Sequence, residues 1–168
     1  NFGQRKLIMQ IAMTVAGIVA MFIIANIDYH LLVDKLWIFM LAASVLLLGI
    51  TLVFGSSGEN METANTSWLK IPGIGIMIQP SEFVKGTFIV TFSKHLDAVK
   101  NRINHPMSLL GLGLHAGTII GLIMLSGDLG VALVYCGIVA LMLFCAGLSL
   151  FYFFGAGVAI FAAIPYVW

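Results

Sequence analysis

Two ionisable residues, Glu82 and Lys85, stand three residues apart in a stretch that is otherwise apolar, directly after the sequence Gln79-Pro80-Ser81. Pro80 suits the first position of a helix, because its missing N–H has no partner to lose there. Glu82 then falls in the first helical turn, where the helix dipole favours an anion. Lys85 lies on the same helix face. The pattern predicts an ion pair in a polar cavity, where ionisable groups of membrane segments normally lie.

The spacing of this pair leaves two functions open. A carboxylate and an ammonium at the end of a membrane helix can hold a substrate that bears phosphate or hydroxyl groups. A buried pair can equally fix helix packing without chemistry, although desolvation then opposes the attraction between the charges.

A third carboxylate, Asp128, lies between two long apolar runs in the sequence SGDLGVAL. Asp is a favoured N-cap, so one interpretation is that Asp128 ties down the start of the following helix. The functional alternative is an acidic group at the outer membrane boundary, on the same side as Glu82. We predict that Glu82, Lys85 and Asp128 line one outward-facing cavity, with Lys85 placed to pair with either carboxylate.

The composition indicates a membrane protein. The 168 residues are 61% hydrophobic and only 9% charged, with a mean hydropathy of +1.08. A soluble domain carries about 25% charged residues. The net charge of +1 gives no indication of a nucleic-acid partner. The histidines lack the spacing of zinc ligands, so no metal site is predicted.

The apolar runs predict an all-α fold, a polytopic transmembrane bundle of about six helices, since a helix needs about 20 residues to cross a bilayer. The predicted spans are Leu7–Ile27, Leu36–Phe54, Pro80–Leu96, Met107–Ser126, Leu129–Ala146 and Leu150–Trp168. The predicted polar connections include Asp28–Lys35, Gly55–Lys70 and Lys94–His105. Residues 1–168 then form a single integral membrane domain.

Orientation follows from the basic residues of the short loops. The connection Lys94–His105 is the most clearly basic, which places it in the cytoplasm. The connection Gly55–Lys70 and the turn at Asp128 are then predicted to lie outside.

The fourth predicted span carries Gly113, Gly117 and Gly121 at four-residue spacing, with His115 among them. Small residues at this spacing let helices approach closely, so the stripe predicts tight helix packing. His115 is interpreted as a hydrogen-bonded packing residue.

Several motifs together resemble the SEDS family (shape, elongation, division and sporulation), which includes FtsW, RodA and SpoVE. They are Trp68-Leu69, the sequence QPSEFVK ending at Lys85, and the sequence GDLG around Asp128. Four positions depart from the family pattern. Ser67 and His30 stand where the family usually has Arg, Gly127 stands in place of Pro, and Val131 stands in place of Thr. The resemblance implies that this chain corresponds to the second through seventh helices of a larger protein of about ten helices.

The resemblance implies a multi-pass peptidoglycan glycosyltransferase of the bacterial cytoplasmic membrane. Such enzymes polymerise lipid II, a disaccharide peptide on undecaprenyl diphosphate, at the outer membrane face. They work with a class B penicillin-binding protein during elongation, division or sporulation. A transporter of the lipid-linked precursor and a scaffold without chemistry of its own remain alternatives.

The resemblance also assigns roles to residues. Those implied in catalysis are Glu82, Lys85 and Asp128, and those implied in substrate binding are Trp68, Lys70, Gln79 and Ser81. The family's general base is an Asp in an outer loop expected beyond Trp168. A divalent cation at the diphosphate is implied too, although the sequence shows no ligands for it.

Overall fold

The computed structural model describes residues 2–26, 29–56, 66–70 and 77–155. Its elements, in chain order, are α1 (Phe2–Ala25), α2 (Tyr29–Phe54), β1 (Leu69–Lys70), β2 (Met77–Ile78), α3 (Pro80–Val99), the 3-10 turn η1 (Lys100–Arg102), α4 (Pro106–Leu125) and α5 (Leu129–Cys145). Residues 150–155 are also helical. The rest of the sixth predicted span lies outside the described residues.

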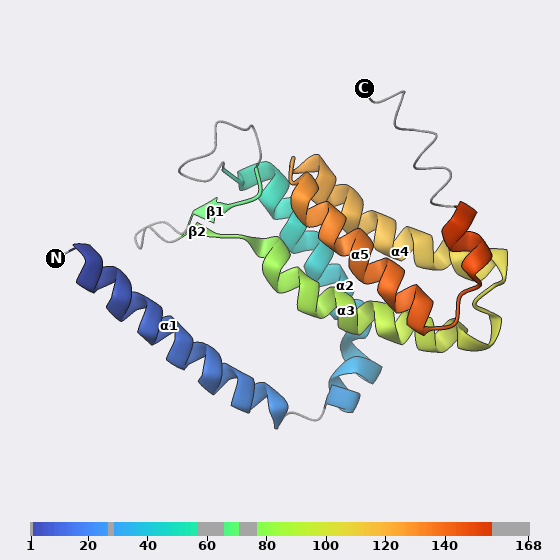
Figure 1. Ribbon diagram of the computed structural model, residues 1–168, viewed down its shortest axis with the longest axis horizontal. Coiled ribbons are helices and arrows are strands. Elements are labelled where there is room, and N and C mark those ends of the chain that lie inside the picture. Colours follow the sequence, from blue (N-terminus) through green and yellow to red (C-terminus); the bar gives the residue numbers. More distant parts are fainter. Residues whose placement is uncertain (1, 27–28, 57–65, 71–76, 156–168) are drawn as a thin grey trace.

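Helices α2 to α5 form a bundle in which α3 packs against α2, α4 and α5 (Figure 1). The buried side chains at the contacts include Phe88, Phe92, Ile119 and Tyr135. Successive helices run in opposite directions, so α3 and α5 are parallel to each other and begin at the same end of the bundle. We call this the QPSE end, after the sequence of Gln79 to Glu82, and the other end, where α4 begins, the opposite end.

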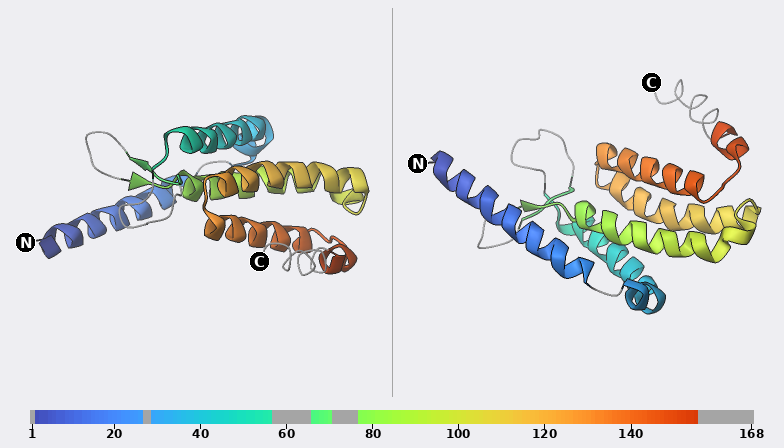
Figure 2. Two further views of the ribbon diagram at one scale, coloured as in Figure 1. Left: turned by 90° about the horizontal axis from the view of Figure 1, so that it is seen from above. Right: turned by 60° about the horizontal axis from the view of Figure 1, so that its bottom comes forward.

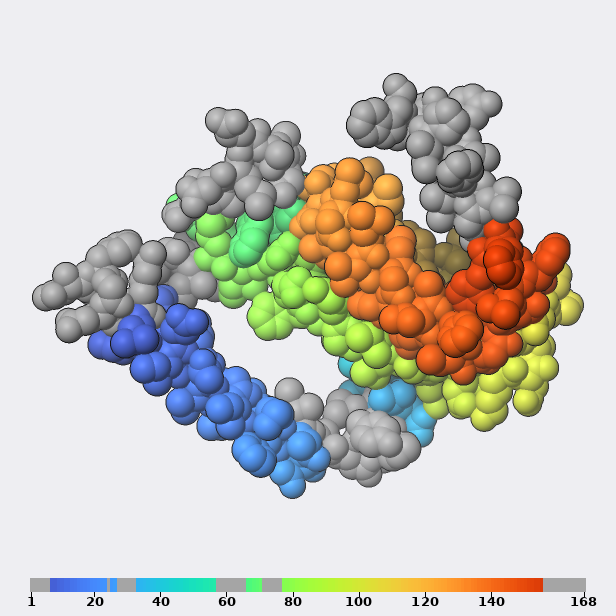
Figure 3. Space-filling view, viewed as in Figure 1, coloured from blue at the N-terminus to red at the C-terminus, as the bar shows by residue number. Residues whose placement is uncertain are grey.

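Helix α1 stands apart from this bundle in Figure 1, and the left view of Figure 2 shows it extending away from the bundle to one side. The space-filling view in Figure 3 shows an open space between α1 and α3. The side chains of residues 7–23 are exposed all around the helix, and most of them are apolar. Such a helix is hydrophobic on every face, which is typical of a segment that lies in lipid or is covered by other membrane helices.

Two helices are long and apolar enough to cross a membrane by length and composition, namely Val33–Phe54 and Pro106–Leu125. Leu7–Ile23 and Leu129–Cys145 are shorter apolar helices. The helical segments therefore match five predicted spans in position and type, while the number that cross the membrane stays a prediction.

Two predicted connections are wrong in part. Helix α2 begins at Tyr29, so most of the predicted turn Asp28–Lys35 is helical, and α3 runs to Val99, past the start of the predicted loop Lys94–His105. The two extensions meet where the Lys94 ammonium donates to the Asp34 carboxylate. Charged side chains that find partners let a helix continue beyond its apolar stretch, which a reading by hydropathy alone misses.

The predicted all-α class holds except for one short pair of strands. β1 and β2 pair in antiparallel register, with Leu69 opposite Ile78 and Lys70 opposite Met77. Backbone groups outside helices need hydrogen-bond partners, and this pairing supplies them on the approach to α3.

His115 is a buried, hydrogen-bonded residue, as predicted. Its Nε2 lies 3.3 Å from the Thr91 hydroxyl, and its Nδ1 lies 3.2 Å from Nδ1 of His95. The predicted packing of the glycine stripe is not found, because a Cβ at Gly113 or Gly117 would have no neighbouring atom within 4 Å. The same holds for Gly121, so none of the described residues packs against the stripe.

Candidate functional site

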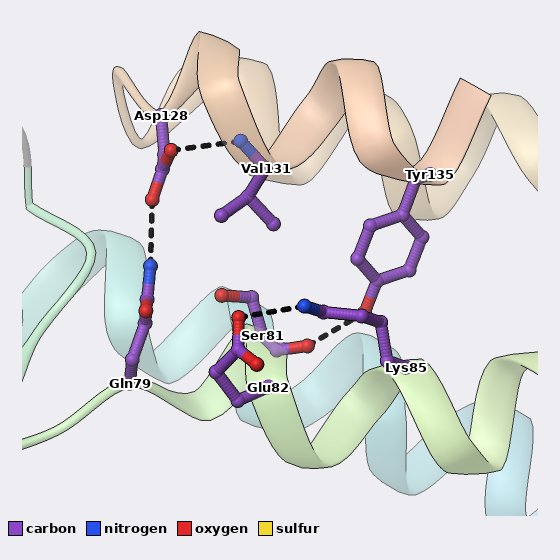
Figure 4. Close-up of polar contacts among 7 residues, drawn as sticks. All are labelled: Gln79, Ser81, Glu82, Lys85, Asp128, Val131 and Tyr135. Atoms are coloured by element: carbon purple, nitrogen blue, oxygen red, sulfur yellow. Dashed lines mark hydrogen bonds and ion pairs between the residues drawn. The ribbon is translucent and has the colours of Figure 1, made fainter. Parts of the chain in front are cut away.

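Helix α3 begins at Pro80, as its sequence predicts, with Gln79 as the N-cap residue. The predicted ion pair is present, since Lys85 Nζ lies 2.7 Å from Glu82 Oε1 (Figure 4). The Lys85 side chain is 24% exposed and that of Glu82 is 53% exposed. The pair therefore lies at the margin of the bundle, with Lys85 the more enclosed partner.

The turn between α4 and α5 places Asp128 beside this pair. Gly127 has a φ of +82°, its N–H donates to the Met124 carbonyl, and the Asp128 N–H donates to the Ile123 carbonyl. These two bonds form a Schellman motif, in which a left-handed residue ends the helix. Proline cannot adopt a positive φ, so this turn is incompatible with the Pro that the resemblance expects in place of Gly127.

Asp128 uses its two carboxylate oxygens on two different helices. Oδ1 accepts a hydrogen bond of 3.0 Å from the Val131 N–H, which confirms that Asp128 caps α5. Oδ2 accepts a hydrogen bond of 2.7 Å from Nε2 of Gln79, on the other side of the interface (Figure 4). The cap and the contact with α3 therefore coexist, and the starts of α3 and α5 are held together.

The structure pairs Lys85 with Glu82 and Asp128 with Gln79, so the predicted freedom of Lys85 to pair with either carboxylate is not realised in these contacts. In Figure 4 the side chains of Gln79, Glu82 and Lys85 nevertheless lie between α3 and α5, and Asp128 reaches toward them from the start of α5. Whether they line one outward-facing cavity stays a prediction.

Tyr135 is part of this interface and was missed by the sequence analysis. The ring is fully buried against Phe88, and its hydroxyl donates a hydrogen bond of 2.7 Å to the Ser81 carbonyl. Tyr135 follows Asp128 by seven residues, which is two helical turns, so both lie on the face of α5 that meets α3. The sequence could have indicated this role, because a tyrosine two turns after Asp128 in an apolar helix is expected to be buried and to need a hydrogen-bond partner for its hydroxyl.

Ser81 faces the bundle interior. Its hydroxyl and that of Ser67 are buried and have no hydrogen-bond partner among the described residues. Both line a small cavity that also includes Thr51 and Ser126. The Ser81 hydroxyl therefore faces this interior cavity, and the Ser81 carbonyl is the group that joins the polar contacts by accepting from Tyr135.

Trp68 and Lys70 lie on the chain that leads to α3 but are not joined to these residues. Trp68 forms an isolated backbone bridge with Ser56, and Lys70 is exposed on β1. Within the described ranges, no hydrogen bond connects either side chain with Glu82 or Asp128. The structure thus brings together five predicted site residues, Gln79, Ser81, Glu82, Lys85 and Asp128. Trp68 and Lys70 lie apart from them, on the segment of chain that precedes α3.

Positive and negative groups meet at the QPSE end. Because α3 and α5 are parallel, the positive ends of both helix dipoles lie there. The Lys85 ammonium adds a full charge one turn from the start of α3. Glu82 and Asp128 balance this positive potential, and each already accepts a hydrogen bond.

The described residues offer no group of three His, Cys, Asp or Glu side chains that could hold a metal ion. They therefore do not supply a ligand set for the divalent cation that the resemblance implies, and we assign no residue of this part of the chain to a metal.

Comparison with known proteins gives a family for nearly the whole chain. The family model described as "Cell cycle protein", for FtsW, RodA and SpoVE, matches residues 2–168. No match was found among curated proteins or among solved structures. The motifs around Glu82 and Asp128, the helical bundle and this match lead to one conclusion: the chain belongs to the FtsW/RodA/SpoVE family of membrane proteins, the SEDS family.

Proposed function

We propose that the full-length protein is a peptidoglycan glycosyltransferase that polymerises lipid II at the outer face of the bacterial cytoplasmic membrane. The observation that carries the proposal is the hydrogen bond between Gln79 and Asp128, which joins the starts of two parallel helices beside the Lys85–Glu82 pair. The family's role in the cell cycle agrees with this activity.

The reaction joins two sugars and releases a diphosphate. A sugar 4-hydroxyl attacks the anomeric carbon of the second substrate, the bond to the undecaprenyl diphosphate breaks, and the hydroxyl proton passes to a base. Negative charge develops on the departing diphosphate. Positive groups already in place where that charge appears stabilise the transition state.

Lys85 is the group we assign to the departing diphosphate. It lies near the positive ends of α3 and α5, and its ammonium is held by the Glu82 carboxylate at 2.7 Å. Glu82 is then a positioning residue for Lys85. Asp128 fixes the relative positions of the two helices through Gln79 and Val131, and it contributes a charge to the polar side of the interface.

The approach of the attacking sugar and the partner protein follow from the same proposal. The sugar hydroxyl would approach from the side of Trp68 and Lys70, which lie on the chain before α3. A class B penicillin-binding protein would cross-link the product. The general base belongs to the outer loop that the family carries after the segments seen here.

A polymerisation assay tests the proposal. Purified full-length protein, supplied with lipid II and a class B penicillin-binding protein, is expected to form glycan strands. Movement of lipid II across proteoliposomes without polymer would favour the transporter. Binding of the penicillin-binding protein without either activity would favour the scaffold, and both outcomes contradict the proposal.

A further inference from the structure

A second polar site lies at the opposite end of the bundle, far along α3 from Glu82. It is a groove of about 480 Å³ at the junction of α3, η1 and α4. Its walls include His95, Arg102, His105, Ser108 and Gly111. This end contains the connection that the basic residues place in the cytoplasm, so the groove lies where lipid headgroups of the inner leaflet are expected.

Two hydrogen-bond donors of the groove are available to a ligand. Arg102 is exposed and forms no ion pair within the described part of the chain. His105 accepts from the Met107 N–H at its Nδ1, so its ring proton is on Nε2, which can donate. A guanidinium and an imidazole N–H together match the oxygens of a phosphate group.

Ser108 adds a further polar group to the wall of the groove. The residue is only 7% exposed, and its hydroxyl makes no hydrogen bond among the described residues. The Ser108 N–H is already used, because it donates to the His105 carbonyl. The hydroxyl oxygen itself is not fully buried, so it opens onto the wall of the groove and can bond a ligand oxygen.

The shape of the groove is held by neighbouring residues. The His95 ring is fixed by its contact with His115 at 3.2 Å. Gly111 lies against that ring, since a Cβ there would be 3.5 Å from the His95 Nε2. A larger side chain at residue 111 would occupy the space between the ring and α4.

An apolar surface continues from the groove toward the membrane interior. Met107 lines the groove, and Leu110 and Leu114 follow at three and seven residues, so all three share one face of α4. All three side chains are exposed. A phosphate in the groove would therefore have acyl chains beside this stripe, which distinguishes a lipid from a soluble anion.

We propose that this groove binds the phosphate of an anionic phospholipid headgroup, held by Arg102, His105 and Ser108. The acyl chains lie along Met107, Leu110 and Leu114. The proposal depends on the membrane setting of the family and is independent of the glycosyltransferase activity, because it concerns the other end of the bundle.

Native mass spectrometry of the purified full-length protein tests the site, with phosphatidylglycerol titrated against phosphatidylcholine. The wild type is expected to bind one molecule of phosphatidylglycerol more tightly than further phosphatidylglycerol molecules and than phosphatidylcholine. Arg102→Gln removes a charge-assisted contact and should weaken that step by about tenfold. Ser108→Ala, a small change at a hydroxyl without a partner, should weaken it by a few fold.

Lys100→Gln is the matched control. It removes one positive charge two residues from Arg102, but Lys100 is already paired with Asp97 and is not among the residues of the groove. Equal losses in Lys100→Gln and Arg102→Gln would overturn the proposal in favour of a general attraction to basic residues. Equal retention of both lipids would overturn it as well. Displacement of the lipid by millimolar inorganic phosphate would show a soluble phosphate to be the occupant and would overturn the lipid assignment.

Discussion

Helix α3 and the turn η1 that follows it carry the same pattern twice, an acidic residue with a lysine three residues later, once near each end of α3. Glu82 and Lys85 form an ion pair of 2.7 Å at the QPSE end, and Asp97 and Lys100 form one of 2.9 Å at the opposite end. Both Asp97 and Lys100 are 63% exposed, and the hydrogen bond from Lys100 lowers the pKa of Asp97. Lys85, by contrast, is mostly enclosed.

The surroundings of the two pairs explain this difference. At the QPSE end a second helix begins beside the pair, Asp128 is hydrogen-bonded to Gln79, and Tyr135 is hydrogen-bonded to the Ser81 carbonyl. At the opposite end, α3 passes into η1 and the pair projects from it. The same local sequence pattern thus gives a surface ion pair in one place and a candidate reaction site in the other, and the neighbouring helix decides which.

The largest expected effect separates the two lysines. Lys85→Gln in the full-length protein should lower glycan polymerisation by about 100-fold or more, since it removes a positive group from the developing diphosphate charge. Lys100→Gln should leave the rate within about twofold, because an exposed pair contributes little. Rates measured with lipid II under identical conditions check this. Similar losses in the two variants would remove the distinction between the two ends of α3.

A smaller effect is expected on stability at the start of α5. Asp128→Ala removes both the helix cap and the contact with Gln79, and the loss of a cap alone costs about 1 kcal/mol. The midpoint of thermal unfolding in detergent should fall. Asp97→Ala, the control on the exposed pair, should leave the midpoint nearly unchanged. An unchanged midpoint for Asp128→Ala would argue against Asp128 as the link between α3 and α5.

The smallest effect concerns two tyrosines whose hydroxyls donate to backbone carbonyls. Tyr135→Phe removes a buried hydrogen bond to Ser81, which we expect to cost about 1 kcal/mol. Tyr152→Phe removes an exposed hydrogen bond of 3.1 Å to the Asn104 carbonyl and should cost less. Chemical unfolding of both variants ranks them. The reverse order would mean that the Tyr135 hydroxyl does not stabilise the interface of α3 and α5.

The local features of the site were predictable from sequence because they depend on nearby residues. Pro80 marks the start of α3, the spacing of Glu82 and Lys85 gives their ion pair, and Asp128 caps the helix that follows it. The partner of Asp128 was not predictable. Gln79 is 49 residues away, and only the packing of α3 against α5 brings the two side chains together.

Errors in the predicted fold have the same origin. Hydropathy placed the start of α2 too late and the end of α3 too early. The ion pair of Asp34 with Lys94 supports both extensions, and its partners are 60 residues apart on different helices. The glycines Gly113 and Gly117 have the spacing of a packing stripe, yet no described residue has an atom within 4 Å of a Cβ built at either position. The spacing of residues shows which side chains share a helix face, but the tertiary packing determines which other helix, if any, contacts that face.

The central claim is that the QPSE end, with the charge of Asp128 included, is where the full-length protein polymerises glycan. Asp128→Asn tests it most directly, because Asn caps a helix about as well as Asp but carries no charge. The Gln79 amide can rotate to keep a hydrogen bond to it. Polymerisation of lipid II by the full-length variant, at an unfolding midpoint close to the wild type, should fall sharply, because the family resemblance implies a role in activity for the Asp128 carboxylate. Full polymerisation by a well-folded Asp128→Asn protein would contradict the claim and leave Asp128 with the cap as its role.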